Sequence, residues 1–375
     1  MIDIKNIFSQ KTKAFGLDIS DLSLKIADLE KIEGGLNLVS FGSSNIPPGI
    51  IEEGKVKDEN ALSEIIKKAV REVKGKKIKT KYVVASLPEE KSFLDVVRIP
   101  SMAEEEIESA VRYEIENYIP VKLEEVYFDF ERIESTSKDK TYQEVLITAL
   151  PKEIVEGYLS ALKRAGLQPV ALEVECLSIA RALIKKDKPF SPLLIIDFGE
   201  TRTTFIIFSG KSLRFTSTIP VSSQKLTESI SNTLKVDLKK AEEFKIKHGL
   251  EGEKAVFEAM IPPLTDLVEQ IKTHLDYYHS HEKEIQPVRK EKGEKKTGTK
   301  KKGNDLNKIL LCGGGANLKG LVSFLASNLK IKVELGNPWV NILKRPLKEV
   351  PELPFEQSLG YTTALGLALR GIYGD

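Results

Sequence analysis

The stretch FGLDISDLSLKI at residues 15–26 decides the fold of this chain, because the stretch IIDFGETRTTFI at residues 195–206 repeats its plan. Each is an apolar strand that ends on an aspartate, followed by a turn of small or polar residues and a second, alternating strand. Two such hairpins predict two related lobes that face each other. Asp18 and Asp197 each stand beside a turn rich in backbone N–H donors, which suits a metal-bound phosphate chain. The repeat therefore predicts nucleotide binding between the lobes.

The charge of the chain is concentrated in one stretch. The formal net charge is +2, but residues 289–302 hold eight basic and two acidic residues, a local +6, so the remainder sums to −4. A mildly acidic folded part gives no case for nucleic-acid binding. Cys176 and Cys312 are too few for a disulfide framework and fit a reducing cytoplasm. No run of eighteen apolar residues is present, so no membrane-spanning helix is expected.

Residues 282–304 are expected to form a disordered basic loop, because they lack apolar anchors. The simpler interpretation is a solvated loop. The alternative is that residues 289–302 contact anionic lipid, since each clustered lysine contributes about 1 kcal/mol near such a surface.

The order of strand and helix patterns predicts an α/β protein of two lobes. Residues 1–86 and 151–190, with a C-terminal helix at 356–375, are expected to form the first lobe. Residues 87–150 interrupt the alternation with a helix and a strand pair, which predicts an inserted small α+β subdomain. Residues 191–355 are expected to form the second lobe. Its helical subdomain, about 224–280, is predicted to hold helices at 224–235, 238–247 and 263–280.

A third element is Gly313-Gly314-Gly315, which follows a predicted strand and precedes a helix. Missing side chains let a planar ring or a phosphate approach the backbone, and the helix N-terminus adds a favourable dipole. The segment is neither a P-loop nor a dinucleotide fingerprint, because the required spacing is absent. A plain flexible turn is the alternative interpretation.

The three elements, in this order, resemble the actin-like ATPase superfamily, which has a duplicated RNase H-like fold. The resemblance implies ATP and Mg²⁺ as cofactors, with the metal bound by Asp18 and Asp197 through water. It implies a phosphate hairpin at 15–27, a second at 195–208 and an adenosine motif at 311–318. The implied cofactor-binding residues of these three elements are Asp18, Ser20, Ser23, Lys25, Asp197, Gly199, Thr201, Thr203, Gly313, Gly314 and Gly315.

Two helical segments extend the resemblance. Residues 172–183 look like the superfamily's first connecting helix, with Glu175 in the place of its catalytic or water-positioning acid. Residues 241–247 are similar to the helix that contacts ribose and adenine in bacterial actins, which makes Glu242 and Lys245 candidate nucleoside contacts. An ordinary Glu/Lys helix face is an equal alternative for these two residues.

The inserted block narrows the resemblance to one family. The phrases FLDVVRIPSMAEEEIESAVRYEIENYIPVKLEEVYFDF at 93–130 and AGLQPV at 165–170 are similar to the PilM family of type IV pilus assembly, which is close in fold to FtsA. The resemblance implies a cytoplasmic, nucleotide-dependent scaffold that is recruited to the inner membrane and works with other pilus assembly proteins. It implies that the scaffold grips the N-terminal tail of the membrane protein PilN in a groove beside the insertion.

Other functions on the same fold remain open at this stage. An FtsA-like filament former is one alternative, and a kinase or phosphatase is another, because fold alone does not decide function. The sequence shows no convincing base for an attacking water, so we expect at most a slow ATPase. It does not indicate the oligomeric state.

Overall fold

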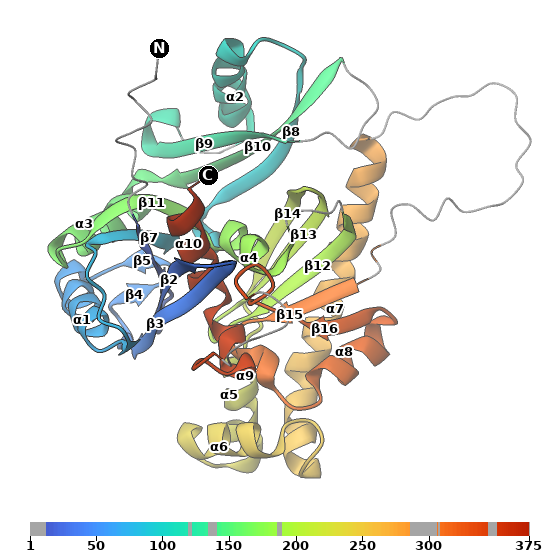
Figure 1. Ribbon diagram of the computed structural model, residues 1–375. Helices are drawn as coiled ribbons and strands as arrows, with labels where there is room; N and C mark the ends of the chain where they lie inside the picture. Colours follow the sequence, from blue (N-terminus) through green and yellow to red (C-terminus); the bar gives the residue numbers. More distant parts are fainter. Residues whose placement is uncertain are drawn as a thin grey trace, which may run out of the picture.

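The computed structural model describes residues 13–118, 122–133, 141–185, 190–285, 306, 308–343 and 351–374. The stretch at 289–302, for which a lipid contact is one expectation, lies outside these residues, and so does most of the expected basic loop at 282–304. Two large sheets stand side by side, and a smaller layer lies across one end of both (Figure 1).

The two large sheets repeat one plan. The first has the order β11 (Gln168–Val174), β7 (Tyr82–Leu87), β1 (Phe15–Ile19), β2 (Ser23–Ile32), β3 (Gly35–Asn45) and β6 (Lys74–Gly75). The second has the order β16 (Lys332–Leu335), β15 (Lys308–Cys312), β12 (Phe190–Phe198), β13 (Thr203–Gly210) and β14 (Ser212–Ile219). In each sheet the first hairpin strand pairs antiparallel with the next strand and parallel with its other neighbour. The predicted duplicated α/β fold is therefore confirmed.

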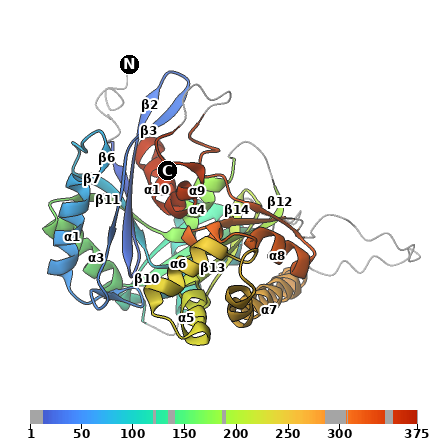
Figure 2. The same ribbon diagram turned by 90° about the horizontal axis from the view of Figure 1, so that it is seen from below.

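Helices fill the space between the sheets and cover the first sheet on its other side. α1 (Glu59–Arg71) and α3 (Lys152–Arg164) cover the outer face, whereas α4 (Glu175–Leu183) and α10 (Thr362–Tyr373) lie between the two sheets (Figure 2). α10 follows a short helix α9 (Phe355–Ser358) and a 3-10 turn η5 (Leu359–Tyr361). A Cβ on Gly366 of α10 would lie 2.5 Å from the carbonyl carbon of Ser178 in α4. The two helices therefore meet backbone to backbone, which only glycine permits at this position.

The block at 87–150 forms a separate small sheet and a helix at the top of Figure 1. The sheet order is β8 (Phe93–Pro100), β10 (Tyr142–Pro151) and β9 (Val126–Ile133), and α2 (Glu104–Tyr118) packs on it. Glu144 of β10 forms ion pairs with Arg98 of β8 and with Arg214 of β14. The small sheet is thus tied to the second large sheet through a buried carboxylate.

The helical part of the second half holds α5 (Ser223–Leu234), α6 (Leu238–His248) and α7 (Lys254–Ile285). The prediction that the third helix begins at Pro263 was wrong, because α7 begins at Lys254 and runs through Pro262 and Pro263. An interior proline costs a helix about 3 kcal/mol. Met260 and Leu264, on either side of the prolines, are fully buried. Burial of this continuous apolar face offsets the cost, since each such side chain contributes about 1.5–3 kcal/mol.

Candidate functional site

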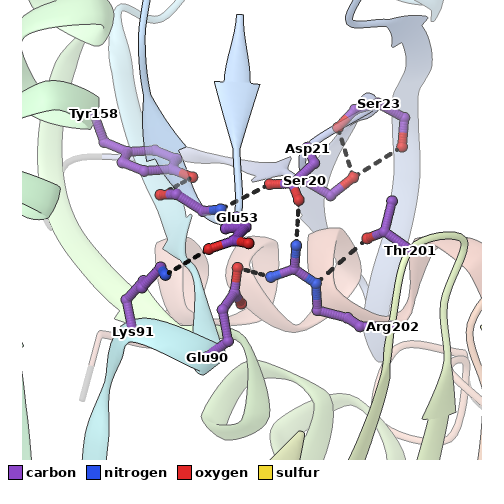
Figure 3. Close-up of polar contacts among 10 residues, drawn as sticks. Ser20, Asp21, Ser23, Glu53, Glu90, Lys91, Tyr158, Thr201 and Arg202 are labelled. Carbon is purple, nitrogen blue, oxygen red and sulfur yellow. Dashed lines mark hydrogen bonds and ion pairs between the residues drawn. The ribbon is translucent and has the colours of Figure 1, made fainter. Parts of the chain in front are cut away.

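The turn of the first hairpin gathers polar groups. The Ser20 hydroxyl donates to the carbonyl of Ser23 at 3.0 Å, and the two serine hydroxyl oxygens lie 3.1 Å apart (Figure 3). Lys25 lies two residues after Ser23 in β2, and its ammonium donates to the Ser23 hydroxyl at 3.3 Å. Three of the predicted phosphate contacts therefore converge at one end of β1 and β2.

The two aspartates of the hairpins lie close enough to affect one another. Asp18 is 6% exposed and accepts a hydrogen bond of 3.2 Å from Ser86. Burial raises the pKa of Asp18, and the charge of Lys25 opposes this. Burial and then the charge of Asp18 raise the pKa of Asp197 to about 6, again against Lys25. The two carboxylates therefore lie near enough to repel one another, and their joint role in binding a metal stays a prediction.

Two glutamates complete an acidic cluster. Glu175 is the first residue of α4, and burial, followed by the charges of Asp18 and Asp197, raises its pKa well above the usual value. Glu89 lies in the 3-10 turn η2 (Glu89–Lys91), is 5% exposed, and has an Oε2 atom without a hydrogen-bond partner in the described part of the chain. Glu89 could not be predicted as a site residue, because nothing in the local sequence Pro-Glu-Glu-Lys distinguishes it from a surface turn.

Repulsion among these acids favours a bound cation. Within the described residues, no three His, Cys, Asp or Glu side chains are arranged to hold a metal directly. Mg²⁺ keeps several of its waters and often uses only one or two carboxylates. The site therefore fits Mg²⁺ bound through water by Asp18 and Asp197.

The glycine segment adjoins the second aspartate. Gly313 has φ +84°, and a Cβ there would lie 2.6 Å from the Phe198 carbonyl oxygen. A Cβ on Gly315 would lie 2.6 Å from the Phe198 ring, so both outer glycines are required by the fold. A Cβ on Gly314 would meet nothing within 4 Å. The middle glycine therefore faces open space, which a planar ring can use.

The second hairpin presents fewer side chains than expected. The Gly199 N–H donates to the Arg202 carbonyl at 3.0 Å and closes the turn, and the Thr201 hydroxyl accepts from the Arg202 guanidinium at 3.3 Å. Thr203 is fully buried, and its hydroxyl donates to the Val221 carbonyl at 2.6 Å. The structure therefore does not bring the Thr203 hydroxyl together with the other predicted contacts.

The two nucleoside candidates lie against the start of α5. Lys245 is 6% exposed, and its ammonium donates to Ser223 at 2.8 Å and to Thr227 at 2.7 Å. Glu242 pairs with the same ammonium at 2.8 Å. Because the Ser223 N–H donates to the Gly199 carbonyl at 3.0 Å, this cluster adjoins the second hairpin. Glu242 and Lys245 also form the i, i+3 ion pair of an ordinary Glu/Lys helix face, so their contact with a nucleoside stays a prediction.

The duplicated sheets, the facing hairpins and the glycine segment define a protein of the actin-like ATPase fold. The chain belongs to the type IV pilus assembly protein PilM family, whose model matches residues 16–290 and 296–372. A solved PilM-PilN type IV pilus biogenesis complex contains a chain that is 29% identical, with a TM-score of 0.79 over 96% of this chain and 99% of that one.

More distant likenesses support the fold alone. The ethanolamine utilization protein EutJ of Carboxydothermus hydrogenoformans is 13% identical, with a TM-score of 0.54 over 95% of this chain and 89% of that one. Among curated relatives, the cell division protein FtsA of Enterococcus faecalis is 24% identical over 62% of this chain. The match spans 57% of the length of that relative. No helix in the described ranges is long and apolar enough to cross a membrane.

Proposed function

We propose that this chain binds ATP with Mg²⁺ between its two hairpins and serves as a cytoplasmic scaffold of type IV pilus assembly. In this proposal it is recruited to the inner membrane by gripping the N-terminal tail of a PilN-like protein. The observation that carries the nucleotide part is the pair Asp18 and Asp197, held together against mutual repulsion beside an open glycine segment.

The residues divide into roles by position. Asp18 and Asp197 would hold the metal waters, and the bound Mg²⁺ would screen the phosphate charge. Lys25 would pair with phosphate oxygens. Glu175 would orient a water, with slow hydrolysis at most. The remaining contacts comprise hydroxyls and N–H groups for the phosphates at Ser20, Ser23, Gly199 and Thr201, and nucleoside contacts at Glu242, Lys245, Gly313, Gly314 and Gly315. Thr203 is left out, because its buried hydroxyl donates to the Val221 carbonyl.

A groove of about 880 Å³ between the small sheet and the body of the molecule supports the partner part of the proposal. Its walls come from β9, β10, β11, α4 and the turn between β13 and β14. The apolar lining includes Leu87, Leu146, Leu150, Val155, Leu172, Leu177, Ile184, Phe208 and Leu213. Below this lining, Glu173 is fixed by Arg181 at 2.6 Å and by Arg370 at 3.3 Å.

The groove offers a strand edge as well as apolar surface. β9 is the last strand in the order of the small sheet and pairs with β10 on one side. The Phe130 N–H donates to the side chain of its own neighbour Asp129 at 2.9 Å, which shows that this amide points away from β10. An extended peptide can add to such an edge through its backbone and place alternate apolar side chains in the groove. We propose this mode for the PilN-like tail.

Two measurements test the proposal separately. Asp197→Ala should abolish Mg²⁺-dependent ATP binding in calorimetric titration while the protein stays folded, and unchanged affinity would refute the metal assignment. For the partner, a pull-down against a PilN-type N-terminal peptide is performed with and without ATP. Thr148→Trp, which fills the groove from β10, should abolish capture, whereas Leu238→Trp on the exposed surface of α6 should not. Equal capture by the two variants would show that the tail binds elsewhere.

The catalytic alternative has its own measurement. Kinases of this chemistry turn over roughly 1–100 times per second. Steady-state ATP turnover at that rate would overturn the scaffold proposal, because we expect slow hydrolysis or none.

A further inference from the structure

Arg202 lies in the turn between β12 and β13 and reaches across to the first half of the molecule. Its guanidinium forms ion pairs with Asp21, in the turn between β1 and β2, and with Glu90 of η2 (Figure 3). The side chain is 20% exposed. Sequence analysis assigned no role to this arginine or to either of its acidic partners. The two hairpin turns are thus joined by one cation.

Two of the acids around Arg202, Asp21 and Glu53, have partners besides the arginine. The Asp21 carboxylate accepts the Gly54 N–H at 2.9 Å, and the Gly54 carbonyl accepts the Tyr158 hydroxyl at 3.2 Å (Figure 3). Gly54, at φ +74°, sits in the turn between β4 (Ile51–Glu52) and β5 (Lys55–Val56), and its neighbour Glu53 pairs with Lys91 at 3.6 Å. These contacts fix Asp21 and Glu53, whereas both carboxylate oxygens of Glu90 lack a hydrogen-bond partner among the described residues and its ion pair is with Arg202. Asp21 can therefore keep its place when the long arginine side chain moves.

The charges at this place determine which group a phosphate can bind. Three carboxylates, of Asp21, Glu53 and Glu90, face the two cations Arg202 and Lys91, which leaves one negative charge in excess. A phosphate group arriving here cannot bind the carboxylates. It can bind the guanidinium, whose planar fork fits phosphate oxygens at two points.

The position of Arg202 relates it to one end of the nucleotide. The glycine segment marks the nucleoside end of the site, and Gly360 adjoins Gly314. Lys25 reaches from there to the first hairpin turn, because its Cε would be 3.8 Å from a Cβ on Gly360 and its ammonium donates to the Ser23 hydroxyl at 3.3 Å. The hairpin turns mark the phosphate end. Arg202 belongs to the turn of the second hairpin and points at the turn of the first, so it stands where the last phosphate of a chain would lie.

We propose that Arg202 is the residue that distinguishes ATP from ADP, by leaving Asp21 and Glu90 to pair with the terminal phosphate. This inference rests on the proposed nucleotide site and deepens it. In this proposal, Arg202 pairs with Asp21 and Glu90 when no terminal phosphate is bound, and it pairs with the phosphate when ATP is bound. Only two residues separate Glu90 from the start of β8, so its release reaches the root of the small sheet beside the partner groove.

The test uses three variants in calorimetric titrations with two probes, the Mg²⁺ complexes of ADP and of the non-hydrolysable analogue AMPPNP. Arg202→Ala should weaken binding of the analogue by about tenfold to a hundredfold, the range for a lost charged hydrogen bond, and leave ADP within about twofold. Glu90→Gln removes a competitor for the guanidinium and should tighten the analogue by about two- to fivefold. In the double variant Arg202→Ala/Glu90→Gln, the Glu90→Gln change should no longer tighten binding of the analogue.

The opposite signs of the two single variants separate a phosphate contact from a static bridge between the lobes. If the ion pair only holds the lobes together, both variants break it and both shift the two nucleotides in the same direction, which overturns the inference. Arg112→Ala, which removes an exposed arginine of α2, is the matched control and should change neither affinity. If the wild type binds neither probe, the proposed function falls with the inference. If it binds both and Arg202→Ala leaves their ratio unchanged, only the inference falls.

Discussion

Replacing Asp197 with asparagine is expected to stabilise the nucleotide-free protein while it removes nucleotide binding. The carboxylate is held near Asp18 and Glu175 in a buried setting, and its pKa is raised from 3.8 to about 6. A difference of about two pKa units corresponds to about 3 kcal/mol that favours the protonated over the charged form. Asparagine keeps the shape and an acceptor for the Cys312 thiol, which lies 3.8 Å away, but carries no charge. We therefore expect a gain of about 1–3 kcal/mol in the free energy of unfolding at pH 7.5.

The gain in the free energy of unfolding caused by Asp197→Asn should depend on pH. Between about pH 4 and pH 6 the folded protein holds a proton on Asp197 that the unfolded chain has released. The contribution of this group to the free energy of unfolding therefore falls as pH rises through that window. The advantage of Asp197→Asn should be complete above about pH 6.5 and should shrink toward zero near pH 4.

Urea unfolding of both proteins at pH 4.5, 5.5, 6.5 and 7.5 measures this dependence, with Asp266→Asn on the exposed side of α7 as a control for the loss of one carboxylate. Addition of Mg²⁺ and ATP should then reverse the ranking, because a ligand stabilises only the protein that binds it. A loss of stability at pH 7.5, or a difference between the two proteins that does not change with pH, would refute the like-charge explanation.

Three further predictions concern packing and charge. Gly314→Leu should leave the free energy of unfolding within about 0.5 kcal/mol, because the site is open, but should weaken ATP binding at least about tenfold in titration. Gly366→Ala should lower the free energy of unfolding by about 3 kcal/mol in urea, since its methyl group would overlap the Ser178 carbonyl. Arg214→Met should lower the free energy of unfolding by about 1.5–3 kcal/mol at pH 7, because it removes one of the two arginines that pair with the buried Glu144 and leaves Arg98. Burial raises the pKa of Glu144, but its hydrogen bonds and ion pairs with Arg214 and Arg98 outweigh burial and lower the pKa overall. The loss of stability caused by Arg214→Met should therefore become smaller below about pH 4.5 in the same assay.

Much of the fold could be predicted because its signals are local. The hairpins at 15–26 and 195–206 show strand alternation and turn chemistry within a dozen residues, and their repetition fixes the relation between the two sheets. The start of α7 could not be predicted in this way. Pro262 and Pro263 are strong local stop signals, and only tertiary burial of the face that contains Met260 and Leu264 overrides them.

The residues of the candidate site likewise differ in whether a local motif indicates them. The positions of Asp18, Asp197 and the glycine segment could be predicted, because the two aspartates lie near the ends of β1 and β12 and the glycine segment follows β15. Their role in nucleotide binding stays a prediction. The pairing of Arg202 with Asp21 joins residues 181 positions apart, and no pattern in either neighbourhood indicates the other. The hydroxyl of Thr203 was predicted to serve the nucleotide from its place in the motif, yet the structure turns it toward the Val221 carbonyl. Motif position thus located the backbone better than the side chain.

One helix joins the two regions on which the proposed function depends. α4 begins at Glu175, among the acids of the cleft, and carries Arg181 near its other end, where it fixes Glu173 beside the groove. Nine residues of helix span about 13 Å, a distance over which a helix moves as a rigid body. Backbone contact with Gly366 ties α4 to α10, whose Arg370 pairs with the same Glu173. A change of charge at Glu175 that displaces α4 therefore displaces the lining of the groove as well, which gives nucleotide-dependent docking a physical route.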